Sequence, residues 1–258
     1  MRSMDSTTDY LLCSYADYDF LENYCSSVLN RIFVELNEKV LSSFFEKFLD
    51  NFYAINSYKD LCDLKEYTSE YFRDINAVLR NTWNYAENGP VDSKLMDFYK
   101  ELAEKIAGMS NRNECILPTN IKSFRGVSMR TFRKFGVSGL DDIDNLKGQY
   151  IYDDGFTSTS LVREKSFFNK NNHDECNIEI QYLIPCESLD VIPLINKDLS
   201  YSPSQCELLI NRGSLCKIVD VSVVDSKVCL TAIHIPVRIW DKNLDAALKD
   251  ENLRKNVI

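Results

Sequence analysis

Gln205 and Glu207 open an apolar, strand-like run that reads SQCELLINRG over residues 204–213. Side chains two positions apart on a β-strand point to the same face, so the amide and the carboxylate would lie side by side. A carboxylate accepts hydrogen bonds and stabilises nearby positive charge, whereas an amide both donates and accepts. This pair is therefore the first candidate for chemistry.

Two further short stretches carry polar side chains that could act with this pair. The first is SFRGVS around Arg125, whose planar guanidinium stays charged and pairs well with oxyanions. The second is YIYDDGFTSTSLV, which contains Ser158, Thr159 and Ser160. Taken singly, each stretch is more often structural, because Ser and Thr runs mark strand ends and turns and a strand glutamate is usually solvated. A functional interpretation therefore rests on their joint occurrence.

Other common catalytic signatures are absent from the sequence. The eight glycines form neither G-x-G-x-x-G nor G-x-x-x-x-G-K-[ST], which excludes the usual dinucleotide turn and phosphate loop. There is also no G-x-S-x-G and no H-E-x-x-H. The nine cysteines form no C-x-x-C pair and the chain has two histidines, so we expect reduced thiols and no metal site.

Composition limits the classes of partner. The 258 residues are 45% apolar, enough for a real core, and the net charge is −9. Nucleic-acid binders usually gather Lys and Arg, so we expect no nucleic-acid partner and instead a partner with a basic surface. Asp5 and Asp9 lie where a secretory signal needs apolar residues, and no apolar stretch approaches the roughly 20 residues that span a bilayer. We therefore expect a soluble protein without a membrane partner.

The secondary structure predicted to position these residues changes from helices to strands along the chain. Apolar side chains follow a helical spacing in residues 40–55, 69–81 and 92–108, and after about residue 145 the period falls towards two. Asp92 is the expected N-cap of the third helix, with Gly108 just past its end. Helices followed by strands, without regular β-α-β alternation, predict an α+β fold.

In this order the three stretches resemble the Arg/Ser-Thr-Ser/Glu class of mono-ADP-ribosyltransferases, bacterial toxins and effectors that use NAD. The matching residues are Phe124-Arg125-Gly126, Gly155 to Ser160, Glu207 and the helical pattern Ile75-Asn76-Ala77-Val78-Leu79-Arg80. The resemblance implies the ADP-ribosyltransferase fold, with N-terminal helices followed by a mixed two-sheet β core that binds NAD in its cleft. The implied division is a helical region packed on the core at 1–64, a catalytic domain at 65–240 and a tail at 241–258.

The resemblance also assigns roles within the site. Cleavage of the bond between nicotinamide and ribose builds positive charge on the sugar, as glycoside cleavage does, and a carboxylate must meet that charge. Glu207 would be this carboxylate, supported by Ser158 from the neighbouring strand. Arg125 would grip the dinucleotide phosphates. The remaining motif residues expected to bind NAD are Gly126, Thr159 and Ser160.

Two other segments are candidates for NAD contacts. Arg80, with Asn76 on the same helix face, is a candidate phosphate ligand, and an arginine that merely extends from a helix end towards water is the alternative. Phe167 and Phe168 fall where the family has a mobile loop over the nicotinamide. Either ring, with Phe168 as our choice, would stack on the nicotinamide or else anchor the loop.

Gln205 would help to select the acceptor. In this family a Gln two residues before the catalytic Glu occurs in enzymes that modify asparagine and some other uncharged side chains, since a neutral amide lacks the charge that pairs with a guanidinium. Tyr201, in the KDLSYSPS turn, would probe the target protein, and an ordinary exposed tyrosine is the alternative. The implied partner is a host protein, with ubiquitin and a small GTPase as candidates. We expect a monomer that is injected into the host cytoplasm without a cleavable signal, or is otherwise cytoplasmic.

Two other functions of the same fold stay open. One is a module that binds NAD or a protein without turnover, and the other is an NAD glycohydrolase whose acceptor is water. The joint presence of Arg125, Ser158 and Glu207 favours an active transferase, because a binding module has no need of the carboxylate.

Overall fold

The helices of the protein come first along the chain. The computed structural model describes residues 18–82, 92–110, 114–166, 177–224, 227–237 and 239. Its helical elements before the sheet are α2 (Tyr18–Leu29), η1 (Glu38–Val40), α3 (Leu41–Phe44), α4 (Glu46–Ile55), α5 (Tyr58–Glu66), the π-helical turn η2 (Tyr67–Tyr71), α6 (Phe72–Leu79) and α8 (Ser93–Met109). Each of the three stretches expected to be helical is helical in the structure.

The boundaries of two helices differ in detail from the sequence prediction. Residues 40–55 form α3 and α4, which meet at the fully buried Phe45 instead of continuing as one helix. Asp92 is the N-cap of α8, as predicted, and its side chain accepts a hydrogen bond from Lys94 N. The helix runs on to Met109, so Gly108 lies inside its last turn.

The second half of the chain forms a mixed sheet. Its strands are β1 (Ile121–Val127), β2 (Tyr150–Asp153), β3 (Thr157–Ser160), β4 (Ile178–Ile184), β5 (Val191–Leu194), β6 (Glu207–Ile210), β7 (Ser214–Val224) and β8 (Lys227–Ile235). Their order in the sheet is β2-β7-β8-β4-β1-β3-β6-β5. The β4 and β8 strands pair in parallel and the other neighbours are antiparallel. The expected α+β class is confirmed.

The sequence resemblance implies two sheets, but the strands form one continuous sheet. The connection lies between β1 and β3, whose single registered pair is Phe124 and Ser160. By contrast β1 pairs with β4 along seven residues. The β3-β6-β5 group therefore meets the larger group at one point, and this junction brings Arg125 of β1 close to the Ser and Glu strands.

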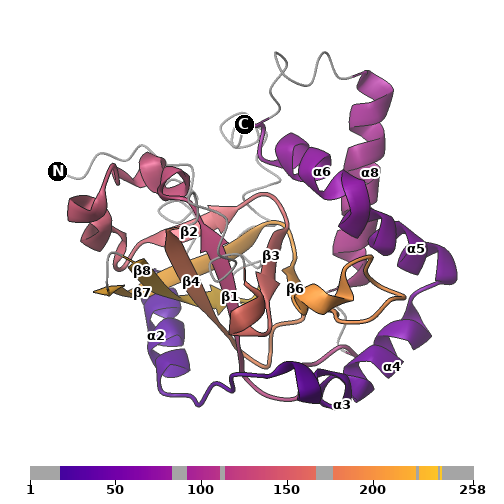
Figure 1. Ribbon diagram of the computed structural model, residues 1–258, viewed down its shortest axis with the longest axis horizontal. Coiled ribbons are helices and arrows are strands. Elements are labelled where there is room, and N and C mark those ends of the chain that lie inside the picture. Colours follow the sequence, from indigo (N-terminus) through magenta and orange to yellow (C-terminus); the bar gives the residue numbers. More distant parts are fainter. Residues whose placement is uncertain are drawn as a thin grey trace.

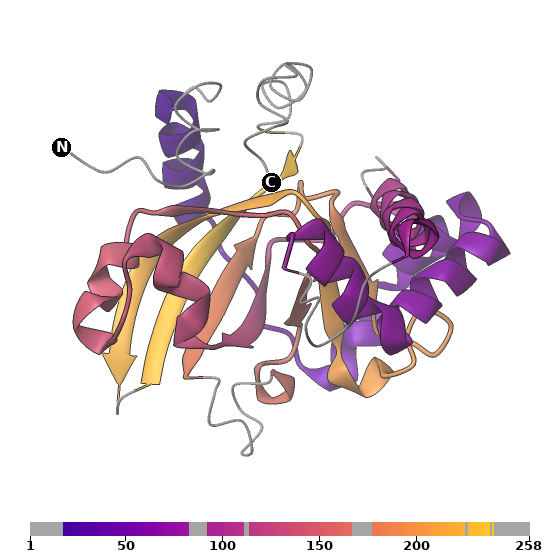
Figure 2. The same ribbon diagram turned by 90° about the horizontal axis from the view of Figure 1, so that it is seen from above.

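Helices cover the two ends of the sheet (Figures 1 and 2). The α4, α5, α6 and α8 helices lie beside β6, and their buried side chains join the main core with those of β1, β4, β5 and β6. The α2 helix lies apart from them and packs Leu21, Cys25 and Val28 on the β7-β8 end. The proposed domain boundary after residue 64 falls within α5, and that division stays a prediction.

Candidate active site

One cleft brings the predicted residues together from distant parts of the sequence. It has a volume of about 520 Å³ and lies between the η2–α6 segment and the strands β1, β3 and β6. The predicted residues that line it are Asn76, Arg80, Arg125, Gly126, Ser158, Gln205 and Glu207. Phe167 and Phe168 lie outside the described residues.

Glu207 is the first residue of β6 and is partly buried in the wall of this cleft. Burial raises the pKa of its carboxyl, and a hydrogen bond from Ser158 and the positive charge of Arg125 act in the opposite direction. The net effect is a pKa above the ordinary value for glutamate. Because burial makes the ionised Glu207 carboxylate less stable, this carboxylate can strongly stabilise a positive charge that develops beside it.

The Thr157–Ser160 strand presents one hydroxyl to the cleft and buries the others. Ser158 is exposed, whereas Thr159 is buried and its Oγ1 donates to Leu208 O at 2.9 Å across the strand pair. The buried Ser160 Oγ lies 3.0 Å from Gln205 O and 2.8 Å from Val162 O. Thr159 and Ser160 thus hold the segment that carries Gln205 and Glu207, and direct contact of either with a dinucleotide stays a prediction.

Gln205 and Glu207 both line the cleft, but they do not lie on one strand as the sequence predicts. Gln205 ends the 3₁₀ turn η7 (Pro203–Gln205), and β6 begins only at Glu207. Between them the buried Cys206 has φ 51° and ψ 47°, a left-handed conformation that is uncommon for a residue with a side chain. This residue turns the chain so that the amide and the carboxylate both line the cleft.

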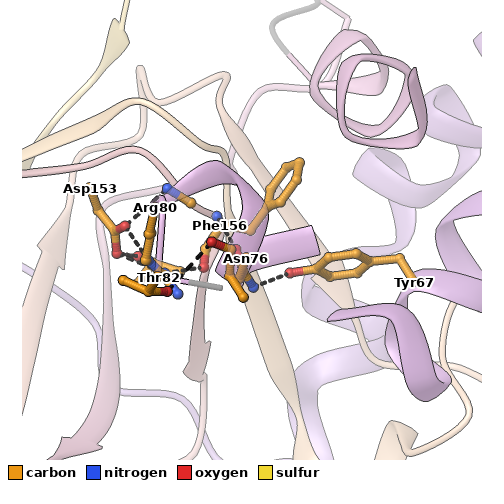
Figure 3. Close-up of polar contacts among 9 residues, drawn as sticks. Tyr67, Asn76, Arg80, Thr82, Asp153 and Phe156 are labelled. Atoms are coloured by element: carbon orange, nitrogen blue, oxygen red, sulfur yellow. Dashed lines mark hydrogen bonds and ion pairs between the residues drawn. The ribbon is translucent and has the colours of Figure 1, made fainter. Parts of the chain in front are cut away.

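Arg80 is held by a carboxylate that the sequence analysis did not single out (Figure 3). Its Nε donates to Asp153 Oδ1 at 2.6 Å, and its Nη2 donates to Asp153 Oδ2 and to Phe156 O, both at 2.9 Å. Burial alone would raise the pKa of the Asp153 carboxyl, but the hydrogen bonds and charge of Arg80, aided by Arg125 and the Gly155 N–H, lower it below the usual range. The pair fixes the β2–β3 turn to the end of α6.

Asn76 and Tyr67 continue this network along the helix (Figure 3). Asn76 Oδ1 accepts from Phe156 N at 2.7 Å, and Asn76 Nδ2 donates to the Tyr67 hydroxyl at 3.1 Å. The Tyr67 and Phe156 rings meet edge to face with centroids 5.2 Å apart. Asn76 therefore positions the strand that carries Ser158, besides lining the cleft itself.

Gly155 allows the helix and the turn to approach each other. A Cβ atom at this position would lie 2.6 Å from Asn76 Oδ1 and 2.7 Å from Arg80 Nε. Real Cβ atoms essentially never come so close to other heavy atoms, so any side chain would push the turn away from α6.

Gly155→Ala is expected to lower the free energy of unfolding by about 1–3 kcal/mol and to weaken NAD binding, because overpacking separates the β2–β3 turn from Asn76 and Arg80. Thermal unfolding and titration with NAD measure the two effects. Gly139→Ala is the matched control, since its Cβ would meet nothing within 4 Å and its backbone is extended. Equal behaviour of the two variants would show that the close approach at Gly155 is unimportant.

Arg125 is the central cation of the cleft. It lies on β1 opposite Ile180 of β4 and forms no ion pair with any residue that the structure describes. Its charge acts on Glu207 and Asp153, which flank it. A guanidinium with free donors between two carboxylates is arranged to accept an anionic ligand while it supports the ionised form of Glu207.

Comparison with known proteins decides the family. The family described as ADP-ribosyltransferase exoenzyme matches residues 24–235. The chain belongs to the ADP-ribosyltransferase exoenzyme family. This ADP-ribosyltransferase exoenzyme is therefore an NAD-dependent mono-ADP-ribosyltransferase of the Arg/Ser-Thr-Ser/Glu class, as the sequence resemblance implied. The search of curated proteins gives no match.

Solved structures agree with this fold. Plx2a, an ADP-ribosyltransferase toxin from Paenibacillus larvae, is 18% identical with a TM-score of 0.61, covering 80% of this chain and all of its own. C3stau2 from S. aureus, solved with NAD, is 16% identical with a TM-score of 0.59 and the same coverage. The C3 exoenzyme of Clostridium limosum is 20% identical with a TM-score of 0.57, covering 80% of this chain and 98% of its own.

The described residues of the exoenzyme hold neither a metal-binding cluster nor a membrane-spanning helix. No three His, Cys, Asp or Glu side chains there gather as a metal site requires. Within the same ranges, every helix is too short or too polar to cross a bilayer.

Proposed function

We propose that this ADP-ribosyltransferase transfers ADP-ribose from NAD to an uncharged side chain of a host regulatory protein, after delivery into the host cytoplasm. The observation that supports the proposal is that Arg125, Ser158, Gln205 and Glu207 line one cleft. The first three would hold NAD and the acceptor around the carboxylate. Ubiquitin and a small GTPase are the candidate targets, and a target with a basic surface would suit the net charge of −9 on this protein.

The reaction exchanges one bond at the ribose. The bond between C1′ and the nicotinamide nitrogen breaks and its electron pair leaves with nicotinamide, while an acceptor nitrogen or oxygen bonds to C1′ and loses a proton. Glu207 stabilises the positive charge that grows on the ribose, and Ser158 holds the carboxylate in its ionised form by a hydrogen bond. Arg125 binds phosphate oxygens, for which its cleft-facing guanidinium has free donors.

Gln205 places an amide beside this carboxylate on the acceptor side. An amide donates and accepts hydrogen bonds, so it suits the carboxamide of asparagine or glutamine or the hydroxyl of threonine. It carries no charge to pair with arginine. Because its backbone is held by Ser160 and by the left-handed Cys206, its position relative to Glu207 is set by the fold.

Tyr201 lies on the surface in the turn before Gln205 and contacts three residues of the preceding helical segment. Its hydroxyl donates to Glu66 Oε1 at 2.9 Å, its backbone N–H donates to Thr68 Oγ1 at 3.2 Å, and Lys65 Nζ lies 5.1 Å from the ring centroid. Tyr201 is nevertheless 54% exposed. A half-exposed aromatic side chain held by these contacts, in the turn before Gln205, suits contact with a target protein.

Gln205→Ala is expected to lower transfer to protein by at least about tenfold while slow NAD hydrolysis continues, because water needs no positioning amide. Mass spectrometry of modified lysate proteins measures transfer and places ADP-ribose on a carboxamide or hydroxyl side chain, and nicotinamide release measures hydrolysis. Modification of arginine, or normal transfer by the variant, would contradict the acceptor assignment and leave the enzyme class intact.

A further inference from the structure

Three arginines and one carboxylate, Glu207, line the cleft, but the charges of the arginines are not equally available. Arg80 directs Nε and Nη2 at Asp153 and shares Nη2 with Phe156 O. Two of the strongest donors of this guanidinium are therefore satisfied within the protein, and its charge is neutralised by a partner less than 3 Å away. A phosphate near Arg80 would have to compete with that carboxylate.

Arg73 lies on the same helix, two turns before Arg80. Residues seven apart share a face of an α-helix and are separated by roughly 10 Å along its axis. Arg73 is exposed and lines the same cleft as Asn76 and Arg80. Its guanidinium carbon lies 5.6 Å from the centroid of the Phe72 ring, and it forms no ion pair with the carboxylates that the structure describes.

The nearest carboxylate in sequence with a described side chain is occupied elsewhere. Asp74 Oδ2 accepts a hydrogen bond from the Tyr99 hydroxyl at 2.9 Å, across the α6–α8 contact. The chain as a whole carries 39 Asp and Glu against 30 Lys and Arg. Arg73 therefore places a positive charge, without a described carboxylate partner, in the cleft of a protein whose net charge is negative. An anionic ligand in the cleft could reach this charge.

Two cations, Arg73 and Arg125, are thus available in the cleft once the Arg80–Asp153 pair is set aside. The pyrophosphate of a dinucleotide carries two negative charges. We propose that Arg73 is a phosphate-binding residue for the dinucleotide pyrophosphate, acting together with Arg125. This inference rests on the proposed use of NAD and names a part of the same cleft.

Arg73→Gln tests the inference in the full chain. Calorimetry with ADP-ribose and with NAD should show affinity about tenfold weaker than wild type, because a charged hydrogen bond to phosphate is lost. Nicotinamide riboside, which has no phosphate, should bind both proteins equally. The dependence of ADP-ribose affinity on salt should also decrease. Arg130→Gln is the matched control, since Arg130 is exposed, forms no described ion pair and does not line the cleft.

The possible results separate the alternatives. Unchanged affinity of Arg73→Gln for ADP-ribose overturns the proposal. An equal loss for nicotinamide riboside would indicate a structural role and also overturn it. If wild type binds ADP-ribose through Arg73 but transfers nothing, the proposed function fails while the phosphate site stands. If Glu207→Gln abolishes transfer and Arg73→Gln binds normally, the phosphate site alone fails.

Discussion

Glu207→Gln is expected to lower transfer of ADP-ribose by at least about a hundredfold, because the amide keeps the shape of the side chain and removes the charge that acts on the transition state. NAD affinity should change little, since the carboxylate acts mainly on the positive charge that grows on the ribose in the transition state. Initial rates with labelled NAD measure the loss. Glu101→Gln on α8 is the matched control, as Glu101 is exposed and distant from the lining of the cleft.

The stability of Glu207→Gln separates a catalytic loss from unfolding. The folded-state pKa of Glu207 lies above its ordinary value, so the folded protein binds this proton more tightly than the unfolded chain. The protonated Glu207 carboxyl therefore contributes favourably to the free energy of unfolding below the pKa of the unfolded chain, and this contribution is lost as pH rises through the folded-state pKa. At neutral pH the ionised carboxylate therefore costs stability, and the variant should melt at the same temperature as wild type or higher. Near-normal turnover in a folded variant would contradict the role of Glu207.

Asp153→Ala is expected to lower the free energy of unfolding by about 3 kcal/mol and to weaken NAD binding, because it leaves Arg80 without its carboxylate. Asp153 also accepts hydrogen bonds from Gly155 N at 3.0 Å and from Thr157 Oγ1 at 2.9 Å. Chemical denaturation measures the change. Asp220→Ala is the matched control, since it removes the exposed Lys147–Asp220 pair and should cost well under about 1 kcal/mol.

The stability difference between Asp153→Ala and wild type should depend on pH. The folded-state pKa of Asp153 is lowered, so its contribution is complete above the unfolded pKa near 4 and is lost as pH falls through the folded value. The two proteins should therefore differ most at neutral pH and converge in acid. A difference that stays constant down to the acid transition would mean that the carboxylate charge does not stabilise the fold.

The sequence predicts the elements of this fold better than their junctions. The apolar spacing in residues 40–55 and 92–108 and the alternation in β4 identify helices and strands, because burial of one face imposes those periods. The strands form one continuous sheet only through the pair Phe124 and Ser160 between β1 and β3. A single residue pair produces no periodic pattern in the sequence. The break at Phe45 likewise reflects tertiary packing of that ring in the core.

The same contrast holds within the site. Glu207, Ser158 and Arg125 lie in short motifs whose order along the chain indicates the family, whereas Asp153 lies beside a motif and shows its role only through contact with Arg80. Tyr67 and Asn76 are nine residues apart, which places them on opposite sides of a regular α-helix. The π-helical turn η2 changes that phase and lets them bond, and such turns often occur at functional sites.

Gln205 and Glu207 line the same cleft, as predicted, but the strand predicted to carry both residues does not include Gln205. The alternation of a strand predicts that they share a face, and they do line one cleft. The structure achieves this through a 3₁₀ turn and the left-handed Cys206, a conformation for which the residue type gives no signal. A glycine there would have indicated the turn; a cysteine does not.

A single incubation tests the central claim, that this protein transfers ADP-ribose from NAD to another protein. Wild type and Glu207→Gln are each mixed with host-cell lysate and with NAD labelled in the adenosine half, and protein-bound label and free nicotinamide are measured together. We predict that wild type attaches label to lysate protein and releases nicotinamide, and that Glu207→Gln does neither above background. Nicotinamide release without protein-bound label would instead indicate a glycohydrolase. Absence of both from wild type would indicate a binding module, and either result would contradict the claim.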